Sequence, residues 1–320
     1  MLAIQAPAKL NLCLRVLNRR ADGYHDLYSV MTFVTESDTL YLHPPNPPNP
    51  PDSPTPTREP ITLTVRAPRA LSMPASSDNL VYRAAQLVRD TFGISAPLAL
   101  TLDKRLPIAS GIGGGSSDAA ACLKLLAAAF QLNPQDSRWQ TIAQRLGADV
   151  PFCWHGTSAI AQGIGERLQP ITLPSPTPPP YVVLANPNQP TSTADVFQAL
   201  TPPFQHKEAI DPTQLTAPTA PAQLWQTLAT LGNDLAPIAQ QKCPSLTPLL
   251  KALQTTDTLL ANVSGSGATC FALYETKAQA DTTLARLRQQ FPSAWLRITT
   301  LQNTAPPVTN IARLPAFTSR

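Results

Sequence analysis

The chain has 320 residues, of which 43% are hydrophobic and 14% charged, so it can bury the cores of two lobes and is not globally disordered. Its 24 basic and 20 acidic side chains form no block of Lys and Arg, which argues against nucleic acid as a partner, and the small positive excess suits an anionic substrate. Five scattered cysteines, no leader-like start and no apolar run of about 18 residues indicate a reduced, cytoplasmic protein without a membrane partner.

The first half of the chain has the patterns of strands followed by two helices. Strands are predicted where apolar residues alternate or run together, at 10–17, 26–34, 39–43, 61–66 and 98–103. One helix follows Asp78 and stops at Gly93, and a second begins at 116–117 and runs to Phe130. Nine of the residues at 44–60 are proline, so we interpret this stretch as a mobile insert that lengthens a loop between strands.

The second half has the element order of an α+β lobe. We interpret a second proline cluster, at 174–180, as part of the join between two lobes. After it we expect a strand, three helices, two strands, a helix and a strand, at 181–185, 195–200, 222–231, 246–253, 258–263, 269–274, 277–291 and 295–301. The expected organisation is an N-terminal lobe of residues 1–163, a C-terminal lobe of residues 164–320 and a loosely held tail from Ala305.

The segment KRLPIASGIGGGSSDAA, at 104–120, is a glycine-rich turn between a strand and a helix. Gly111, Gly113, Gly114 and Gly115 allow a tight turn and a close approach of the backbone to a ligand. Amides at the start of a helix bind phosphate oxygens, so we predict a phosphate site, with an ordinary turn capped by serine as the alternative. The P-loop pattern fails because no lysine follows the glycines, and the Rossmann pattern fails because serine or aspartate stands at its last glycine.

Three segments in this order resemble the GHMP family of small-molecule kinases, named for galactokinase, homoserine kinase, mevalonate kinase and phosphomevalonate kinase. They are PAKLNLCLRVLNRRADGYHDLYSVM at 7–31, LPIASGIGGGSSDAA at 106–120 and NVSGSGATCFALY at 262–274. The resemblance covers nearly the whole chain apart from the insert and the tail. It implies an ATP-binding N-terminal lobe like ribosomal protein S5 domain 2, a ferredoxin-like C-terminal lobe on the substrate side, and Mg²⁺ carried by the ATP.

The pairing of AKLNL with DGYHDL and LGADVPF resembles one branch of this family in particular. Members of that branch phosphorylate the 2-hydroxyl of a CDP-linked methylerythritol in the non-mevalonate isoprenoid pathway. Two alternatives stay open: a sister kinase for homoserine or a mevalonate-type alcohol, and a catalytically silent relative that binds nucleotide or RNA. The sister kinase does not need Tyr24 and His25, whereas the presence of Lys9 and Asp149 argues against a silent relative.

Phosphoryl transfer needs an oriented alcohol, a proton acceptor and positive groups near the phosphates. The resemblance implies Asp149, in LGADVPF, as the base and Lys9, in AKLNL, as the cation beside it. Asn11 alternates to the same face of its strand as Lys9, so one ligand can contact both. Without the resemblance, Asp149 reads as a carboxylate that caps a turn or pairs with an arginine, and Lys9 as a surface lysine on an edge strand.

The remaining substrate contacts are implied at two places. The resemblance assigns the cytosine to Tyr24, by stacking, and to His25, by contact with the base edge; half-buried rings at a turn are the plainer alternative. It also implies contacts from a hydroxyl-rich helix start, where a simple N-cap is the alternative. The residues of this helix start are Thr191, Ser192 and Thr193.

For ATP, the resemblance implies contacts from the glycine turn and from two residues near the adenine end. The full set is Asn79, Lys104, Ser110, Gly111, Gly113, Gly114, Gly115, Ser116 and Ser117. As alternatives, Asn79 caps a helix and Lys104 is merely solvated. No second carboxylate matches a magnesium ligand, so the metal ligand is unknown, with Ser117 as a candidate. The expected assembly is a monomer or a weak homodimer.

Overall fold

The computed structural model describes residues 1–44, 60–68, 77–174, 178–202, 204 and 221–316. The insert predicted at 44–60 lies outside these residues, except for Pro44 and Pro60. Within the described ranges, no helix combines the length and the apolar character that crossing a lipid bilayer requires.

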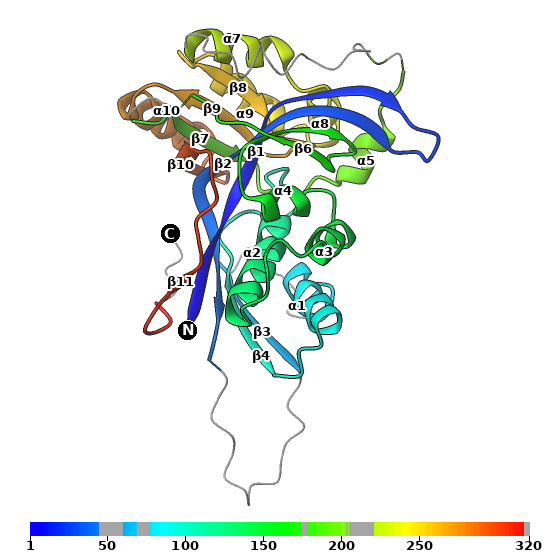
Figure 1. Cartoon of the computed structure of the whole chain (residues 1–320). Coiled ribbons are helices and arrows are strands. Elements are labelled where there is room, and N and C mark those ends of the chain that lie inside the picture. The colour runs from blue at the N-terminus through cyan, green and yellow to red at the C-terminus, as the bar shows by residue number, and fades with distance from the viewer. Residues whose placement is uncertain (45–59, 69–76, 175–177, 203, 205–220, 317–320) are drawn as a thin grey trace, which may run out of the picture.

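Two long strands, β1 (Leu2–Arg19) and β2 (His25–Leu42), form an antiparallel pair that runs through the molecule and ends in a projecting hairpin (Figure 1). Most of their residues are buried, so their apolar pattern is nearly continuous and does not alternate. The local sequence pattern predicts these strands only in shorter pieces. The register of β1 shifts between Pro7 and Lys9, where a residue without an N–H interrupts the ladder.

The strands that complete the sheet are β3 (Ile61–Arg66), β4 (Leu98–Asp103), β5 (Ala159–Gly163), β6 (Arg167–Pro170), β7 (Tyr181–Asn186), β8 (Leu260–Val263), β9 (Cys270–Tyr274), β10 (Trp295–Gln302) and β11 (Thr309–Asn310). The sheet is organised on β2, which pairs with β1 along its length, with β4 near its C-terminal end and with β5 near its N-terminal end. Between these, Leu301 of β10 pairs with Val34 of β2. From β10 the sheet continues through β7 and β9 to β8, so the two lobes share one sheet.

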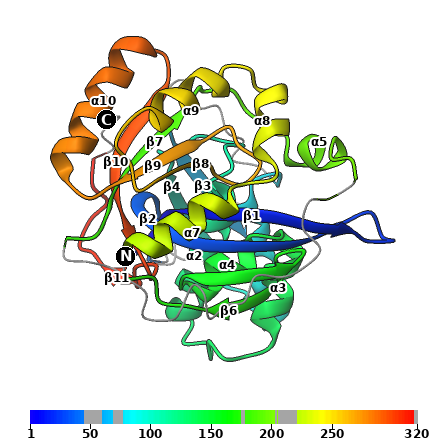
Figure 2. The same cartoon turned by 90° about the horizontal axis from the view of Figure 1, so that it is seen from above.

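The helices form two groups on this sheet. Those of the N-terminal lobe share a core with β2, β3 and β4 and are α1 (Leu80–Phe92), α2 (Gly114–Ala129), α3 (Arg138–Leu146) and α4 (Val150–His155). Those of the C-terminal lobe are α5 (Thr193–Gln198), α7 (Pro221–Leu231), α8 (Ala236–Lys242), α9 (Leu246–Gln254) and α10 (Lys277–Gln290). Helices α8, α9 and α10 pack on β7 and β9, while α7 lies across β1 (Figure 2).

The α+β class and the two-lobed fold predicted from the sequence are confirmed. The short elements α4, α8, β5 and β6 were not predicted. The boundary predicted between residues 163 and 164 falls inside the β5–β6 hairpin. In the tail from Ala305, expected to be loose, the Ala305 N–H donates to the Gly156 carbonyl and β11 pairs with β1.

Candidate active site

A cavity of about 680 Å³ lies where β1, β2 and the C-terminal lobe meet. Its walls come from β1 and β2, the turn between them, the glycine-rich turn, the residues before α4, the start of α5 and the bend between β8 and β9. The sequence-predicted site residues that line it are Lys9, Asn11, Tyr24, His25, Gly111, Ser116, Asp149 and Thr193. One cavity therefore joins residues that lie up to 184 positions apart in the sequence, from Lys9 to Thr193.

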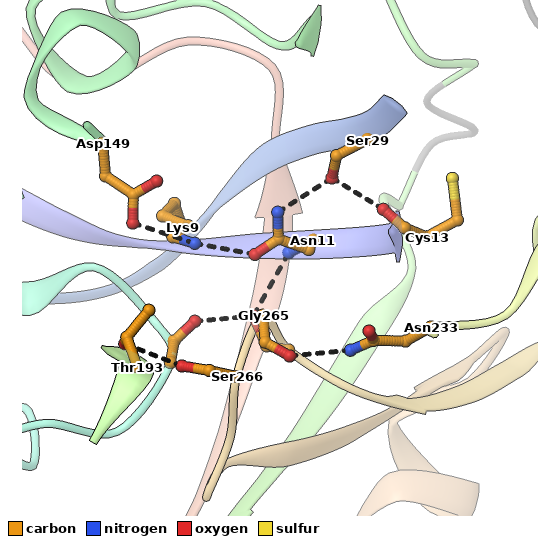
Figure 3. Close-up of polar contacts among 11 residues, drawn as sticks. Lys9, Asn11, Cys13, Ser29, Asp149, Thr193, Asn233, Gly265 and Ser266 are labelled. Carbon is orange, nitrogen blue, oxygen red and sulfur yellow. Dashed lines mark hydrogen bonds and ion pairs between the residues drawn. The ribbon is translucent and has the colours of Figure 1, made fainter. Parts of the chain in front are cut away.

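The Lys9 ammonium and the Asp149 carboxylate form an ion pair in this cavity (Figure 3). Lys9 Nζ lies 3.1 Å from Asp149 Oδ2, and 4% of the lysine side chain is exposed against 39% of the aspartate. Lys9 Nζ also donates to Asn11 Oδ1 over 2.7 Å. Lys9 is thus a buried, hydrogen-bonded cation and not a surface lysine, while the Asp149 carboxylate stays accessible to a ligand.

A hydrogen-bonded chain across β1 and β2 fixes the orientation of Asn11. Asn11 Nδ2 donates to Ser29 Oγ over 2.8 Å, and Ser29 Oγ donates to the Cys13 carbonyl over 2.7 Å. With its amino group occupied in this way, Asn11 turns its carbonyl oxygen toward Lys9. Ser29 was missed from the sequence because only the pairing of β1 with β2 brings it beside Asn11.

Asp149 is placed by a sharp reversal between two helices. Helix α3 ends at Gly147, and Asp149 stands at the N-cap position of α4, but its side chain makes no capping hydrogen bond. The next three residues are buried, and Phe152 stacks on Phe33 at 4.6 Å between ring centroids. The turn-capping alternative for Asp149 is therefore wrong, and the carboxylate instead faces Lys9 from a rigidly packed segment.

The glycine-rich turn packs directly against Lys9 and the bend between β8 and β9. A Cβ atom on Gly111 would lie 2.3 Å from the Ser264 carbonyl oxygen, and one on Gly113 would lie 2.7 Å from Lys9 Cγ. Helix α2 begins at Gly114, and its N-cap is Gly113 in the left-handed region, without a side-chain cap. The serine cap of the alternative interpretation is therefore wrong, because Ser116 and Ser117 already lie inside the helix. The first amides of α2 lack a side-chain acceptor, as a phosphate site requires.

Replacing Gly111 by alanine should lower the free energy of unfolding by about 1–3 kcal/mol more than replacing Gly93 by alanine. Both glycines have a positive φ, +77° and +68°, so the backbone strain is similar. Only at Gly111 does the added methyl group collide with backbone oxygen, because nothing lies within 4 Å of the corresponding position at Gly93. Urea denaturation of both variants measures the difference. Equal losses would mean that the turn has room at Gly111.

Lys104 and Asn79 both have protein partners. Lys104 Nζ is buried, donates to Asp118 Oδ2 over 2.7 Å and forms a second ion pair with Asp38. Burial opposes the charged form of Lys104, but the two carboxylates outweigh it and raise its pKa. Asn79 Oδ1 accepts from the Val81 N–H and caps α1. Neither residue lines the described cavity, and the solvated-lysine alternative is wrong.

Three further hydroxyl residues of the implied ATP set lie around the glycine turn. Ser110 Oγ donates to the Pro107 carbonyl over 2.7 Å, which closes the loop that leads into the turn. The Ser117 N–H donates to the Gly113 carbonyl over 2.8 Å within the first turn of α2. Ser116 lines the cavity, whereas Ser110 and Ser117 are buried beside it.

Aromatic rings gather at the hairpin end of the cavity. Tyr24 is 61% exposed, whereas His25 is buried, with Phe197 at 5.5 Å and Phe204 at 5.7 Å between ring centroids. Burial and the nearby Arg19 lower the pKa of His25, which keeps its ring neutral at pH 7. Its buried Nε2 has no hydrogen-bond partner among the described residues, so it can bind a polar ligand edge.

The hydroxyl residues at the start of α5 have different roles: one lines the cavity and another caps the helix. Thr193 lines the cavity, and its hydroxyl lies 2.8 Å from that of Ser266. Ser192 is the N-cap and accepts from the Asp195 N–H, as the simple alternative predicted. Thr191 is buried beside the cavity, and its N–H donates to the Ala109 carbonyl.

The chain is similar to known proteins over most of its length. Residues 79–157 match the GHMP kinases N terminal domain, and residues 221–293 match the GHMP kinases C terminal domain. A 4-diphosphocytidyl-2-C-methyl-D-erythritol kinase from Paramagnetospirillum magneticum is 42% identical over 297 residues, covering 92% of this chain and 96% of the relative. The chain therefore belongs to the GHMP kinases, and within them to the family of 4-diphosphocytidyl-2-C-methyl-D-erythritol kinases.

Solved structures agree with this assignment. The crystal structure of a 4-(cytidine 5'-diphospho)-2C-methyl-D-erythritol kinase matches with a TM-score of 0.67 at 30% identity, covering 93% of this chain and 99% of that one. A homoserine kinase from Cytophaga hutchinsonii matches with a TM-score of 0.66 at 17% identity, covering 97% of each chain. The second likeness is one of fold, which sister kinases share.

Proposed function

We propose that the protein transfers the γ-phosphoryl group of ATP to the 2-hydroxyl of 4-diphosphocytidyl-2-C-methyl-D-erythritol, in the non-mevalonate route to isoprenoid precursors. The observation that carries the proposal is a single cavity. It contains the Lys9–Asp149 ion pair beside the middle of β1, and it contains Tyr24 and His25 at the hairpin that joins β1 to β2. Such a cavity suits a substrate with an alcohol at one end and a nucleobase at the other. The names of the relatives at 37–42% identity support the same substrate.

The proposed reaction is a direct displacement. The 2-hydroxyl oxygen attacks the γ-phosphorus, the new O–P bond forms, and the bond from that phosphorus to the bridging oxygen breaks, so that ADP leaves with the electron pair. The hydroxyl proton passes to the Asp149 carboxylate. Lys9, 3.1 Å from that carboxylate, holds it in position and stabilises negative charge on the moving phosphoryl group. Asn11 holds the Lys9 ammonium in place.

ATP is proposed to bind with its phosphates at the start of α2. The amides at the start of this helix, which carry no side-chain cap, fit phosphate oxygens. Mg²⁺ accompanies ATP and neutralises part of the phosphate charge. The described residues contain no group of three or more His, Cys, Asp or Glu side chains able to hold a metal ion, so we assign it no protein ligand.

The lobes are proposed to divide the substrates between them. Residues 1–163 supply the phosphate turn and the reacting pair, and residues 164–320 close the substrate side of the cavity through Thr193, Phe197 and Leu235. We propose a cytoplasmic monomer or weak homodimer, with neither nucleic acid nor membrane as a partner. Size-exclusion chromatography with light scattering tests the assembly.

Replacing Tyr24 by alanine should raise the KM for the cytidine substrate about 10- to 100-fold, because stacking on a nucleobase contributes about 1–3 kcal/mol. The turnover number kcat should change little, since Tyr24 lies in the turn after β1, whereas Asp149 pairs with Lys9 in the middle of that strand. Steady-state kinetics at saturating ATP measure both constants. Tyr24→Phe is the matched control and should keep the low KM, because the ring is retained. A fall in kcat at unchanged KM would contradict the stacking role.

The proposed function is tested by offering the purified protein ATP and magnesium with 4-diphosphocytidyl-2-C-methyl-D-erythritol, homoserine, mevalonate and galactose in parallel. ATP consumption identifies the accepted alcohol, and phosphorus NMR locates the new phosphate. We expect product from the first compound alone, phosphorylated on its 2-hydroxyl. Turnover of another alcohol instead would favour a sister kinase, and nucleotide binding without any turnover would favour a silent relative. The Asp149→Asn variant, purified identically, controls for contaminating kinases.

A further inference from the structure

The cavity wall changes from polar to apolar beside Asp149. Asn11 and Ser29 form the polar side, and Ala161 of β5 pairs in register with Ser29 of β2. Asn11 of β1 pairs in register with Met31 and reaches Ser29 through its side-chain hydrogen bond, and the methyl group of Ala161 follows Ser29 on β5. Among the apolar residues that line the cavity, we call the four on β5, on the turn after it and directly before Asp149 the methyl wall; they are Ala148, Ala161, Ile164 and Gly165.

The turn between β5 and β6 holds the methyl wall in a fixed shape. The Ile164 N–H donates to the Glu166 carboxylate over 2.6 Å, and the Gly165 N–H donates to the Gln162 carbonyl over 3.1 Å. A Cβ on Gly165 would lie 3.9 Å from the Ala148 carbonyl oxygen, so this turn lies against the residue that precedes Asp149. The methyl wall is thus preformed and sits next to the proposed base.

Building on the proposed function, we propose that the methyl wall receives the methyl group of the branched polyol and makes the enzyme selective for a tertiary alcohol. In the substrate, the 2-hydroxyl and the methyl group share one carbon atom. When the hydroxyl hydrogen-bonds to Asp149, the methyl group must therefore lie beside that carboxylate. Lys9, Asn11 and Ser29 offer polar groups, with which a methyl group cannot form hydrogen bonds. The apolar side offers it contact with carbon atoms.

Small residues leave the room that this role requires. Ala148, Ala161 and Gly165 have short side chains or none, and Ile164 is half-buried with an apolar side chain at the cavity. A branched residue at 161 would occupy the space of a methyl group, whereas alanine at 164 would withdraw the contact. The first change fills the space for the methyl group and the second enlarges it, yet both should reduce the preference for the methylated substrate.

The experiment compares kcat/KM for the natural cytidine substrate with that for its analogue carrying hydrogen in place of the methyl group. The unchanged protein should prefer the methylated compound by about 10-fold or more, as a single apolar carbon in a fitted pocket allows. Ile164→Ala and Ala161→Val should each reduce this ratio several-fold. Phe197→Ala is the matched control. It removes the ring beside His25 and should weaken both substrates equally, because both carry the same nucleoside.

The outcomes separate the inference from the function on which it rests. A ratio that falls in both wall variants and holds in Phe197→Ala supports the methyl wall. Equal use of both substrates by the unchanged protein, or a ratio that neither wall variant alters, overturns it while the kinase activity stands. Failure to phosphorylate either compound rejects the proposed function itself. If Ile164→Ala does not fold, as judged by circular dichroism, the ratios of the unchanged protein and Ala161→Val still decide.

Discussion

Replacing Asp149 by asparagine should lower kcat about 100- to 10,000-fold, the contribution typical of a positioned general base. Asparagine keeps the size of the side chain and an oxygen that can accept from Lys9, whose Nζ lies 3.1 Å away, so the site should keep its shape. What is lost is the proton acceptor for the 2-hydroxyl. The dissociation constant of the cytidine substrate, measured by calorimetry, should therefore change only a few-fold, while steady-state kinetics report the loss of turnover.

The matched control is Asp281→Asn, an aspartate on the surface of α10 whose ion pair with Lys277 is half-exposed. It changes the same functional group and the same net charge, and it should leave kcat unchanged. Normal turnover by the Asp149→Asn protein would show that another group takes the proton. A parallel loss of substrate affinity and kcat would instead make Asp149 a binding residue.

Local signals explain why much of the fold was predictable. Helix α1 lies between the Asn79 cap and Gly93 because both residues mark helix ends through their own backbone preferences. Helix α10 likewise begins at a capping box formed by Thr276 and Gln279. The full length of β1 and β2 was not predictable, because both lobes bury these strands and only the assembled sheet explains a continuous apolar run.

The residues of the candidate site were also only partly predictable from the sequence. Lys9, Asn11 and Asp149 stand in short motifs, and a resemblance of sequence was enough to name them. Ser29 and Phe197 enter the cavity only through strand pairing and the packing of α5, which no local pattern records. The partners of Lys104 show most clearly what a local sequence pattern cannot predict, because Asp38 lies 66 residues away and contacts Lys104 only in the folded chain.

Replacing Lys104 by methionine should lower the free energy of unfolding by about 3–5 kcal/mol, the cost of leaving buried charges without their partner. Lys104 joins Asp38 of β2 to Asp118 of α2, and all three side chains are at most 2% exposed. Asp38 Oδ1 also accepts from the Arg105 and Leu106 N–H groups, so this cluster ties the end of β4 to both elements beneath the phosphate turn. Methionine fills a similar volume and removes only the charge.

Stability of the Lys104→Met protein should also depend on pH with a definite sign. Burial raises the pKa of Asp118 well above its usual range, and the Lys104 ammonium opposes that rise. Without the ammonium, the pKa should rise further, so the folded protein holds a proton that the unfolded chain releases. Stability is then lost as pH increases through the raised pKa. The free energy of unfolding of the Lys104→Met protein should therefore fall further below that of the unchanged protein at pH 8 than at pH 5.

Urea denaturation at both pH values, together with the KM for ATP, decides the role of Lys104. Lys277→Met, which removes an exposed lysine paired with Asp281, should cost less than about 1 kcal/mol and is the matched control. Asp118→Asn added to Lys104→Met should restore part of the loss, because it removes one of the two stranded carboxylates. An unchanged free energy of unfolding with a raised KM for ATP would show that Lys104 contacts the nucleotide, as the family resemblance implied, and that the buried cluster contributes little.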